Sequence, residues 1–166
     1  MIVTMARTLV LMRHGKSDYP AGVADVARPL AERGRREAAL AGVWMADDGL
    51  SFDHVICSSA TRTRETLDAT SITAPTDYAD SIYAATAEQV CETIRELTPP
   101  DASTVLVVGH EPGMPDTALT LDPHAQITRF PTSTYAVLTV TASWDRLGLS
   151  ADDESTLVAV RVPRND

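Results

Sequence analysis

Short apolar segments alternate with segments of helical periodicity along most of this chain. Residues 7–13 and 104–108 are apolar runs that end in glycine-containing turns, which is typical of buried strands. Residues 30–48 carry small and apolar side chains at helical spacing, with charged side chains on the other faces. Further strands are predicted at 53–58, 135–140 and 156–162, and further helices at 60–69, 86–97 and after Pro112. This alternation predicts a three-layer α/β/α fold with a mostly parallel central sheet.

The composition limits what such a fold can bind. With 166 residues, of which 44% are hydrophobic and 22% charged, residues 1–166 are expected to form a single domain. The 23 acidic and 14 basic residues give a formal charge of -9, which argues against nonspecific binding of nucleic acid or of an anionic membrane. Any anion site must then be built from a local group of cations.

The sequence also favours a reducing, cytoplasmic location. No apolar run approaches the roughly 20 residues of a membrane span, and residues 1–5 lack the layout of a secretion signal. The two cysteines, Cys57 and Cys91, are too few for a disulfide framework and have no zinc-site spacing.

Cationic or cation-capable side chains follow three of the predicted strands. Arg13 and His14 end the first, Arg62 begins the helix after the second, and His110 follows 104–108. In a parallel sheet the carboxyl ends of the strands share one edge, where ligands of open α/β folds bind. Like charges gathered at one edge repel one another unless an anion neutralises them. Guanidinium groups match phosphate oxygens bidentately, so phosphate is a suitable anion. The sequence therefore predicts a phosphoryl pocket.

Several motifs share the order and spacing of a known family. They are Arg13-His14-Gly15, Arg28-Pro29-Leu30 with Gly34, the run Ser58-Ser59-Ala60-Thr61-Arg62 with Thr66, and Gly109-His110-Glu111-Pro112-Gly113. The chain resembles the histidine phosphatase superfamily, which has the phosphoglycerate mutase-like fold, over residues 9 to about 140. The short length, the segment 107–113 and residues 130–133 look most like its small phosphohistidine phosphatase branch, the SixA type.

The resemblance implies a role for each matching residue. His14 would attack phosphorus and form a phosphohistidine intermediate that water hydrolyses, while Arg13, Arg62 and His110 hold the phosphoryl oxygens. Neither a metal nor a cofactor is then expected.

Gly15, Ser17 and Arg28 are also assigned to phosphate binding. Ser17 lies with Lys16 in the loop after His14, where a hydroxyl or ammonium group can contact phosphate, but a solvated loop explains these two residues equally well. Arg28 is either a residue of the pocket mouth or a surface charge.

A general acid is harder to place. Glu111, next to His110, is the nearest candidate, although a carboxylate here could instead favour a helix dipole. The sequence after Tyr83 is Ala84-Ala85 and offers no match to the acid of the mutase branch. An imidazole leaving group needs less proton donation than an alkoxide does. A site without a clear general acid therefore favours phosphohistidine or another activated phosphoryl donor as substrate.

Cys57 raises the question of cysteine-dependent phosphatase chemistry, which uses a C-x5-R loop. Only four residues separate Cys57 from Arg62, and Thr63 stands where the arginine should be. Cys57 is thus interpreted as a small buried strand residue, and His54 and His124, which match no motif, as structural or surface residues.

These observations favour a metal-independent phosphatase acting on a phosphohistidine protein or a small activated phosphoryl compound. Two alternatives stay open: a phosphomonoesterase or mutase for sugar or glycerate phosphates, and a non-catalytic phosphate-binding module. No segment between Tyr78 and Thr98 is long enough for the lid of a mutase. Specificity is expected to come from residues 16–29 and 130–134, and the oligomeric state is left open.

Overall fold

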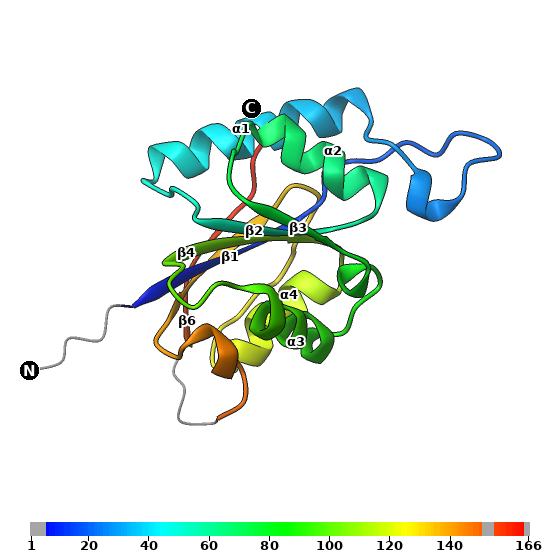
Figure 1. Cartoon of the computed structure of the whole chain (residues 1–166). Coiled ribbons are helices and arrows are strands. Elements are labelled where there is room, and N and C mark those ends of the chain that lie inside the picture. The colour runs from blue at the N-terminus through cyan, green and yellow to red at the C-terminus, as the bar shows by residue number, and fades with distance from the viewer. Residues whose placement is uncertain (1–5, 151–154, 165–166) are drawn as a thin grey trace, which may run out of the picture.

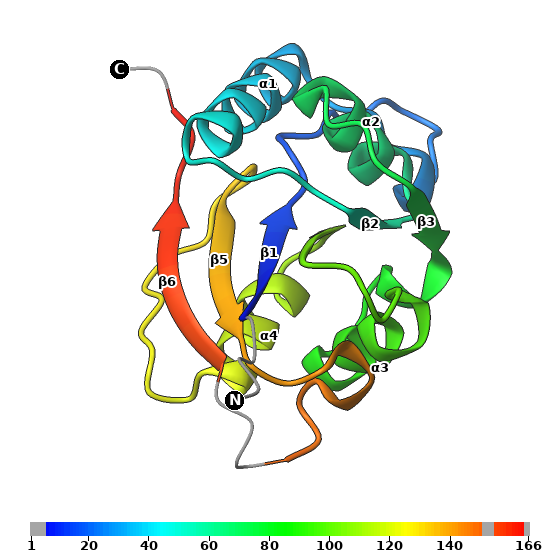
Figure 2. The same cartoon turned by 60° about the vertical axis from the view of Figure 1, so that its left-hand side comes forward.

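The computed structural model describes residues 6–150 and 155–164, and its centre is a six-stranded sheet in the order β3-β2-β4-β1-β5-β6. The strands are β1 (Arg7–Arg13), β2 (His54–Ser58), β3 (Thr76–Ala79), β4 (Thr104–Gly109), β5 (Tyr135–Val140) and β6 (Ser155–Arg161). Strands β1 to β4 run parallel to one another, whereas β5 runs antiparallel to both of its neighbours, β1 and β6. The predicted α/β fold with a mostly parallel sheet is confirmed (Figures 1 and 2).

Helices cover both faces of the sheet. They are α1 (Glu32–Asp47), α2 (Thr61–Thr70), α3 (Ala87–Leu97) and α4 (Gly113–Leu121). Figure 1 shows α1 and α2 on one face and α3 and α4 on the other. Among the described residues, no helix is both long and apolar enough to cross a membrane.

The alternation of side chains along β1 explains the three layers. Leu9 and Leu11 belong to the core on the α3 and α4 side, whereas Val10 and Met12 belong to the core on the α1 and α2 side. All four are fully buried. A strand buried on both faces reads as a continuous apolar run, which is why this segment was recognisable in the sequence.

The predicted elements agree with the structure to within about two residues at their ends. The helix predicted at 86–97 begins with the expected capping box, in which Thr86 Oγ1 accepts from the Gln89 main chain and the Gln89 side chain accepts from Thr86 N. Strand β3 was not predicted, because its four residues are mostly polar or only partly buried. Short 3-10 helices at Asp25–Ala27, Asp80–Ile82 and Trp144–Arg146 were also not predicted.

Gly34 allows α1 to lie directly against the loop that follows β1. A Cβ at this position would lie 2.1 Å from the main-chain oxygen of Lys16. The same loop is held by Ala31, whose N–H donates to that oxygen over 2.8 Å. The absence of a side chain at Gly34 thus fixes the path of the chain immediately after His14.

We expect Gly34→Ala to destabilise the protein by about 1–3 kcal/mol, because main-chain atoms at this contact cannot yield as a flexible side chain would. Helix propensity alone would predict the opposite sign, a gain of about 1 kcal/mol. Urea unfolding measures the difference. Val43→Ala on an exposed position of the same helix is the control and should change stability by less than about 0.5 kcal/mol. A more stable Gly34→Ala variant would contradict this account of the contact.

Candidate active site

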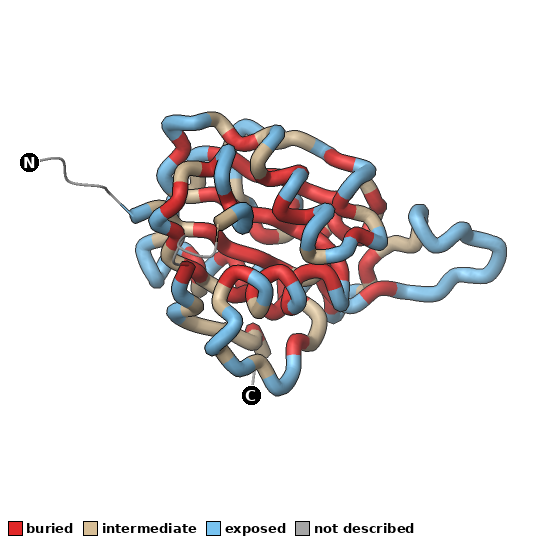
Figure 3. Tube along the Cα trace, turned by 90° about the horizontal axis from the view of Figure 1, so that it is seen from below, coloured by how far each residue is buried: buried red, intermediate tan, exposed pale blue. Residues whose placement is uncertain are grey.

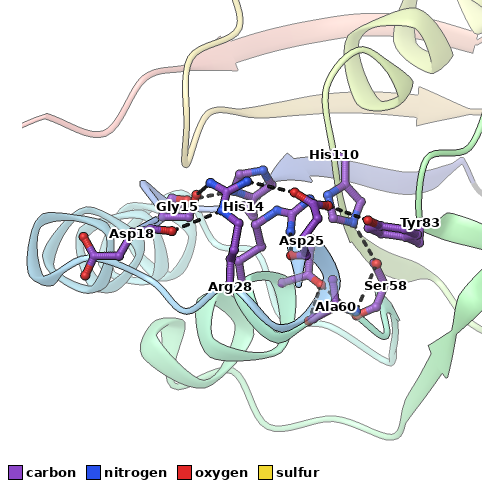
Figure 4. Close-up of polar contacts among 12 residues, drawn as sticks. His14, Gly15, Asp18, Asp25, Arg28, Ser58, Ala60, Tyr83 and His110 are labelled. Carbon is purple, nitrogen blue, oxygen red and sulfur yellow. Dashed lines mark hydrogen bonds and ion pairs between the residues drawn. The ribbon is translucent and has the colours of Figure 1, made fainter. Parts of the chain in front are cut away.

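Parallel pairing of β1 with β4 brings two histidines together at the carboxyl ends of these strands. Arg13 lies opposite Gly109 in the strand register, so the next residues, His14 and His110, are neighbours. Their ring centroids are 5.4 Å apart with an interplanar angle of 58°, and both side chains are buried. The convergence predicted for the two histidines is therefore found in the structure (Figure 4).

A hydrogen bond determines the tautomer of neutral His14. Its Nδ1 lies 2.7 Å from the main-chain oxygen of Gly15, which can only accept, so Nδ1 carries the proton. Nε2 then keeps its lone pair. Gly15 is itself held by α2, because its N–H donates to Thr66 Oγ1 over 2.9 Å. Gly15 thus acts through its main chain, which orients the His14 ring and links it to α2.

His110 is oriented by the end of β2. Its Nε2 lies 2.7 Å from Ser58 Oγ, and its Nδ1 has no hydrogen-bond partner among the described residues. Burial is the largest cause of the lowered pKa values of both rings. Desolvation, followed by the nearby arginines, lowers the pKa of His110 to about 4. Desolvation also lowers the pKa of His14 to about 3, with smaller contributions from His110, Arg62 and Arg13.

The two motif arginines approach the histidines from different elements, and each meets an acidic residue. Arg13 Nη1 donates to the main-chain oxygen of Phe130 over 3.0 Å and lies 3.3 Å from Glu111 Oε2. Desolvation lowers the pKa of Arg13. Arg62, in the first turn of α2, donates from Nη1 to the main-chain oxygen of Asp25 and from Nη2 to its carboxylate. These cations are therefore partly neutralised within the protein.

Arg28 also contacts Asp25, the acidic partner of Arg62. Its Nη1 donates to Asp25 Oδ1 over 2.9 Å, its Nη2 donates to Ser17 Oγ, and its guanidinium lies 3.7 Å from the centre of the Tyr19 ring. Ser17 is buried, and its main chain pairs with that of Leu30 in a single antiparallel β-bridge outside the sheet. Arg28 is thus held by several contacts and is not an isolated surface charge, and Ser17 has a structured position; their roles in phosphate binding stay predictions.

Glu111 directly follows His110, but its carboxylate is already engaged. Its side chain is 49% exposed and forms an ion pair with Arg13. An ionised carboxylate only accepts hydrogen bonds, so its role as proton donor remains a prediction.

Three residues of the site were not singled out from the sequence as functional. Ser58 contacts His110, and Asp25 contacts Arg28 and Arg62. Tyr83 donates a hydrogen bond to Asp25, and its ring packs edge-on against His110 at 5.4 Å. Ser58 was visible inside a motif, but Asp25 lies 37 residues from Arg62 and 58 from Tyr83, so no local pattern pointed to it.

Cys57, unlike these residues, belongs to the core. It is fully buried on the α1 and α2 side of the sheet, and burial raises the pKa of its thiol to about 12. A neutral buried thiol is a poor nucleophile, which supports the interpretation of Cys57 as a packing residue. His54 is buried and pairs with Asp77 over 3.0 Å, and His124 is exposed.

Comparison with known proteins agrees with this geometry. The family model for the histidine phosphatase superfamily (branch 1) matches residues 9–81. A structure from Nakamurella multipartitia, assigned as phosphohistidine phosphatase SixA, is 38% identical, with a TM-score of 0.87 and coverage of 96% of this chain and 97% of that one. The chain belongs to the histidine phosphatase superfamily.

Two further relatives show how far the similarity extends. An uncharacterised protein of Mycobacterium tuberculosis (strain H37Rv) is 44% identical over 168 residues, which cover 92% of this chain and all of the relative. The structure of the protein histidine phosphatase SixA complexed with tungstate is 24% identical, with a TM-score of 0.78 and coverage of 94% of this chain and 97% of that one. The latter likeness shows the shared fold.

We expect the imidazoles of His14 and His110 to stay neutral from about pH 8 to about pH 5, because their pKa values of about 3 and 4 lie below the ordinary value of about 6.5. Imidazole nitrogen NMR measures this directly, with the urea-unfolded chain as the reference.

The same pKa shifts make the stability depend on pH. Below about pH 6.5 the unfolded chain binds more protons than the folded one, so these histidines destabilise the fold progressively as the pH falls towards their folded pKa values. Protonation of either ring near pH 6.5 in the folded protein would contradict this description.

Proposed function

We propose that this protein is a metal-independent phosphatase that uses His14 as nucleophile and forms a phosphohistidine intermediate. The observation that carries the proposal is the state of His14. Its Nδ1 is tied to the Gly15 carbonyl, and its lowered pKa keeps Nε2 unprotonated at neutral pH. A phosphoryl acceptor needs such a lone pair, whereas a module that only binds phosphate would gain more from a protonated imidazole.

The reaction divides into two displacements at phosphorus. In the first, His14 Nε2 forms a bond to phosphorus while the bond to the leaving group breaks, and the leaving group takes up a proton. In the second, water attacks the phosphorus of phosphorylated His14, the bond from phosphorus to Nε2 breaks, and inorganic phosphate is released. Arg13, Arg62 and His110 would stabilise the charge on the equatorial oxygens in both steps.

The substrate is proposed to carry its phosphoryl group on a good leaving group, as phosphohistidine does. The support is the position of Glu111, the acid considered for the site, which forms an ion pair with Arg13. A leaving imidazole needs less proton donation than an alkoxide, so a site of this kind suits a phosphohistidine protein or a small activated phosphoryl compound. A relative assigned as phosphohistidine phosphatase SixA is consistent with this choice.

A phosphomonoesterase is the second candidate. Glu111 follows His110 directly and is half exposed, so it is accessible to a substrate oxygen if it leaves Arg13. The choice of leaving group distinguishes the two functions.

Replacement of His14 tests the nucleophile. We expect His14→Ala to lose at least about 10³-fold in turnover of phosphoramidate and of a phosphohistidine protein, because the covalent step is lost. Rapid quenching of the unsubstituted enzyme should trap an acid-labile phosphohistidine that the variant lacks. The assay contains a chelator, since full activity is expected without metal.

The matched control is His124→Ala, which removes an exposed histidine outside the site and should leave turnover unchanged. Normal turnover by folded His14→Ala would exclude the proposed nucleophile. Loss of all activity in the chelator, with recovery on adding a divalent cation, would exclude the metal-independent mechanism.

Glu111→Gln tests the acid. If Glu111 donates a proton, the variant should slow hydrolysis of alkyl phosphates by about 10²-fold or more and barely affect phosphohistidine or p-nitrophenyl phosphate. The measured quantity is the ratio of kcat/KM values between substrates. Asp116→Asn in the first turn of α4 provides the same change of charge nearby and should leave the ratio unaltered. Equal slowing of all substrates, or no slowing, would exclude an acid role for Glu111.

A further inference from the structure

The carboxylate of Asp25 is bound by three donors from separate parts of the chain. Arg28 Nη1 donates to Oδ1 over 2.9 Å, and Arg62 Nη2 donates to Oδ2 over 3.2 Å. The hydroxyl of Tyr83 donates to the same Oδ2 (Figure 4). Two guanidinium groups and a hydroxyl thus form an anion site, and the carboxylate of Asp25 occupies it.

This anion site adjoins the histidines. The Tyr83 ring that carries the donating hydroxyl packs against His110, whose ring centre is 5.4 Å from that of His14. Arg62 is the cation assigned to the phosphoryl group, and two of its nitrogens are bound to Asp25. The hydrogen bonds from Tyr83 and Arg28 also lower the pKa of Asp25 to about 2, so the group is an anion at neutral pH.

We propose that Asp25 is a specificity-determining residue whose carboxylate competes with the substrate phosphoryl group for Arg62, Arg28 and Tyr83. The proposal rests on the proposed function, because it requires the pocket to bind a phosphoryl group. A phosphoryl dianion near this carboxylate would be repelled by it and would compete for the same donors. Binding therefore moves Asp25 away, and Tyr83 and Arg28 become ligands of the incoming anion.

The surrounding loop allows this displacement without disturbing the core. Asp25 begins the 3-10 helix Asp25–Ala27, which contains no buried residue, and its side chain is 53% exposed. The exposed loop that carries it projects from the body of the molecule (Figure 3). Outward movement of Asp25 would break its polar contacts but expose little apolar surface.

The competition defines which ligands the site accepts. An internal competitor lowers the apparent affinity of every ligand that must displace it, so a weak ligand no longer occupies the site at ordinary concentrations, whereas a strong one still does. A carboxylate ligand offers no more oxygens or charge than Asp25 itself, whereas a phosphoryl group offers three oxygens and up to two charges. Asp25 therefore selects phosphoryl groups over carboxylates and weakens the binding of the product, inorganic phosphate.

The test measures binding of inorganic phosphate by calorimetry, which does not depend on turnover. We expect Asp25→Asn, which has nearly the same shape but no charge, to bind phosphate at least about tenfold more tightly than the unsubstituted protein. The control is Asp18→Asn in the same exposed loop, whose side chain makes none of these contacts with Arg28, Arg62 or Tyr83. It removes the same charge and should change affinity by less than about twofold.

A second comparison separates competition from a positioning role. In the Asp25→Asn background, Tyr83→Phe should remove part of the gain, because Tyr83 would then donate to phosphate. Unchanged or weaker phosphate binding by Asp25→Asn would overturn the proposal and assign Asp25 to the alignment of Arg62. If Asp25→Asn binds phosphate more tightly but the unsubstituted protein turns over no phosphoryl donor, the proposed function alone is overturned. Absence of phosphate binding by all of these proteins would overturn both.

Discussion

The parallel pairing of β1 with β4 is the interaction on which the site depends. It places Arg13 opposite Gly109, and the His14 N–H then donates to the Gly109 carbonyl over 3.0 Å. A slip of one residue would move each apolar side chain of β1 to the opposite face of the sheet and would separate the histidines. Because both faces are covered by helices, the apolar cores that stabilise the fold also fix the geometry of the two imidazoles.

Burial gives these imidazoles their chemical character. An exposed histidine is partly protonated near neutral pH, but desolvation holds His14 and His110 in the neutral form. The arginines act in the same direction. Burial of so many cation-capable groups would be costly without counter-charges, and Glu111 and Asp25 provide them through ion pairs with Arg13 and Arg62. Under the proposed function, an incoming phosphoryl group would therefore meet cations that already have acidic partners.

Much of the site could be predicted from the sequence because its main residues lie at the ends of strongly apolar strands. Arg13 is the last residue of such a strand, His14 and His110 follow strands directly, and Arg62 follows one by a short turn. Residues that reach the site from loops were harder to predict. Tyr83 belongs to none of the motifs in the sequence, and Asp25 lies in an exposed loop with ordinary loop composition.

The sequence by itself determined the alternation of strands and helices, the burial of β1 and β4, and the motif residues at their ends. These properties depend on periodicity and turn chemistry within a few residues. Only the tertiary structure decided the strand order β3-β2-β4-β1-β5-β6, the antiparallel pairing of β5 with β1 and β6, and the meeting of Asp25 with Arg62 and Tyr83. The physical reason is that these contacts join segments far apart in the chain, and the packing of helices on the sheet selects them.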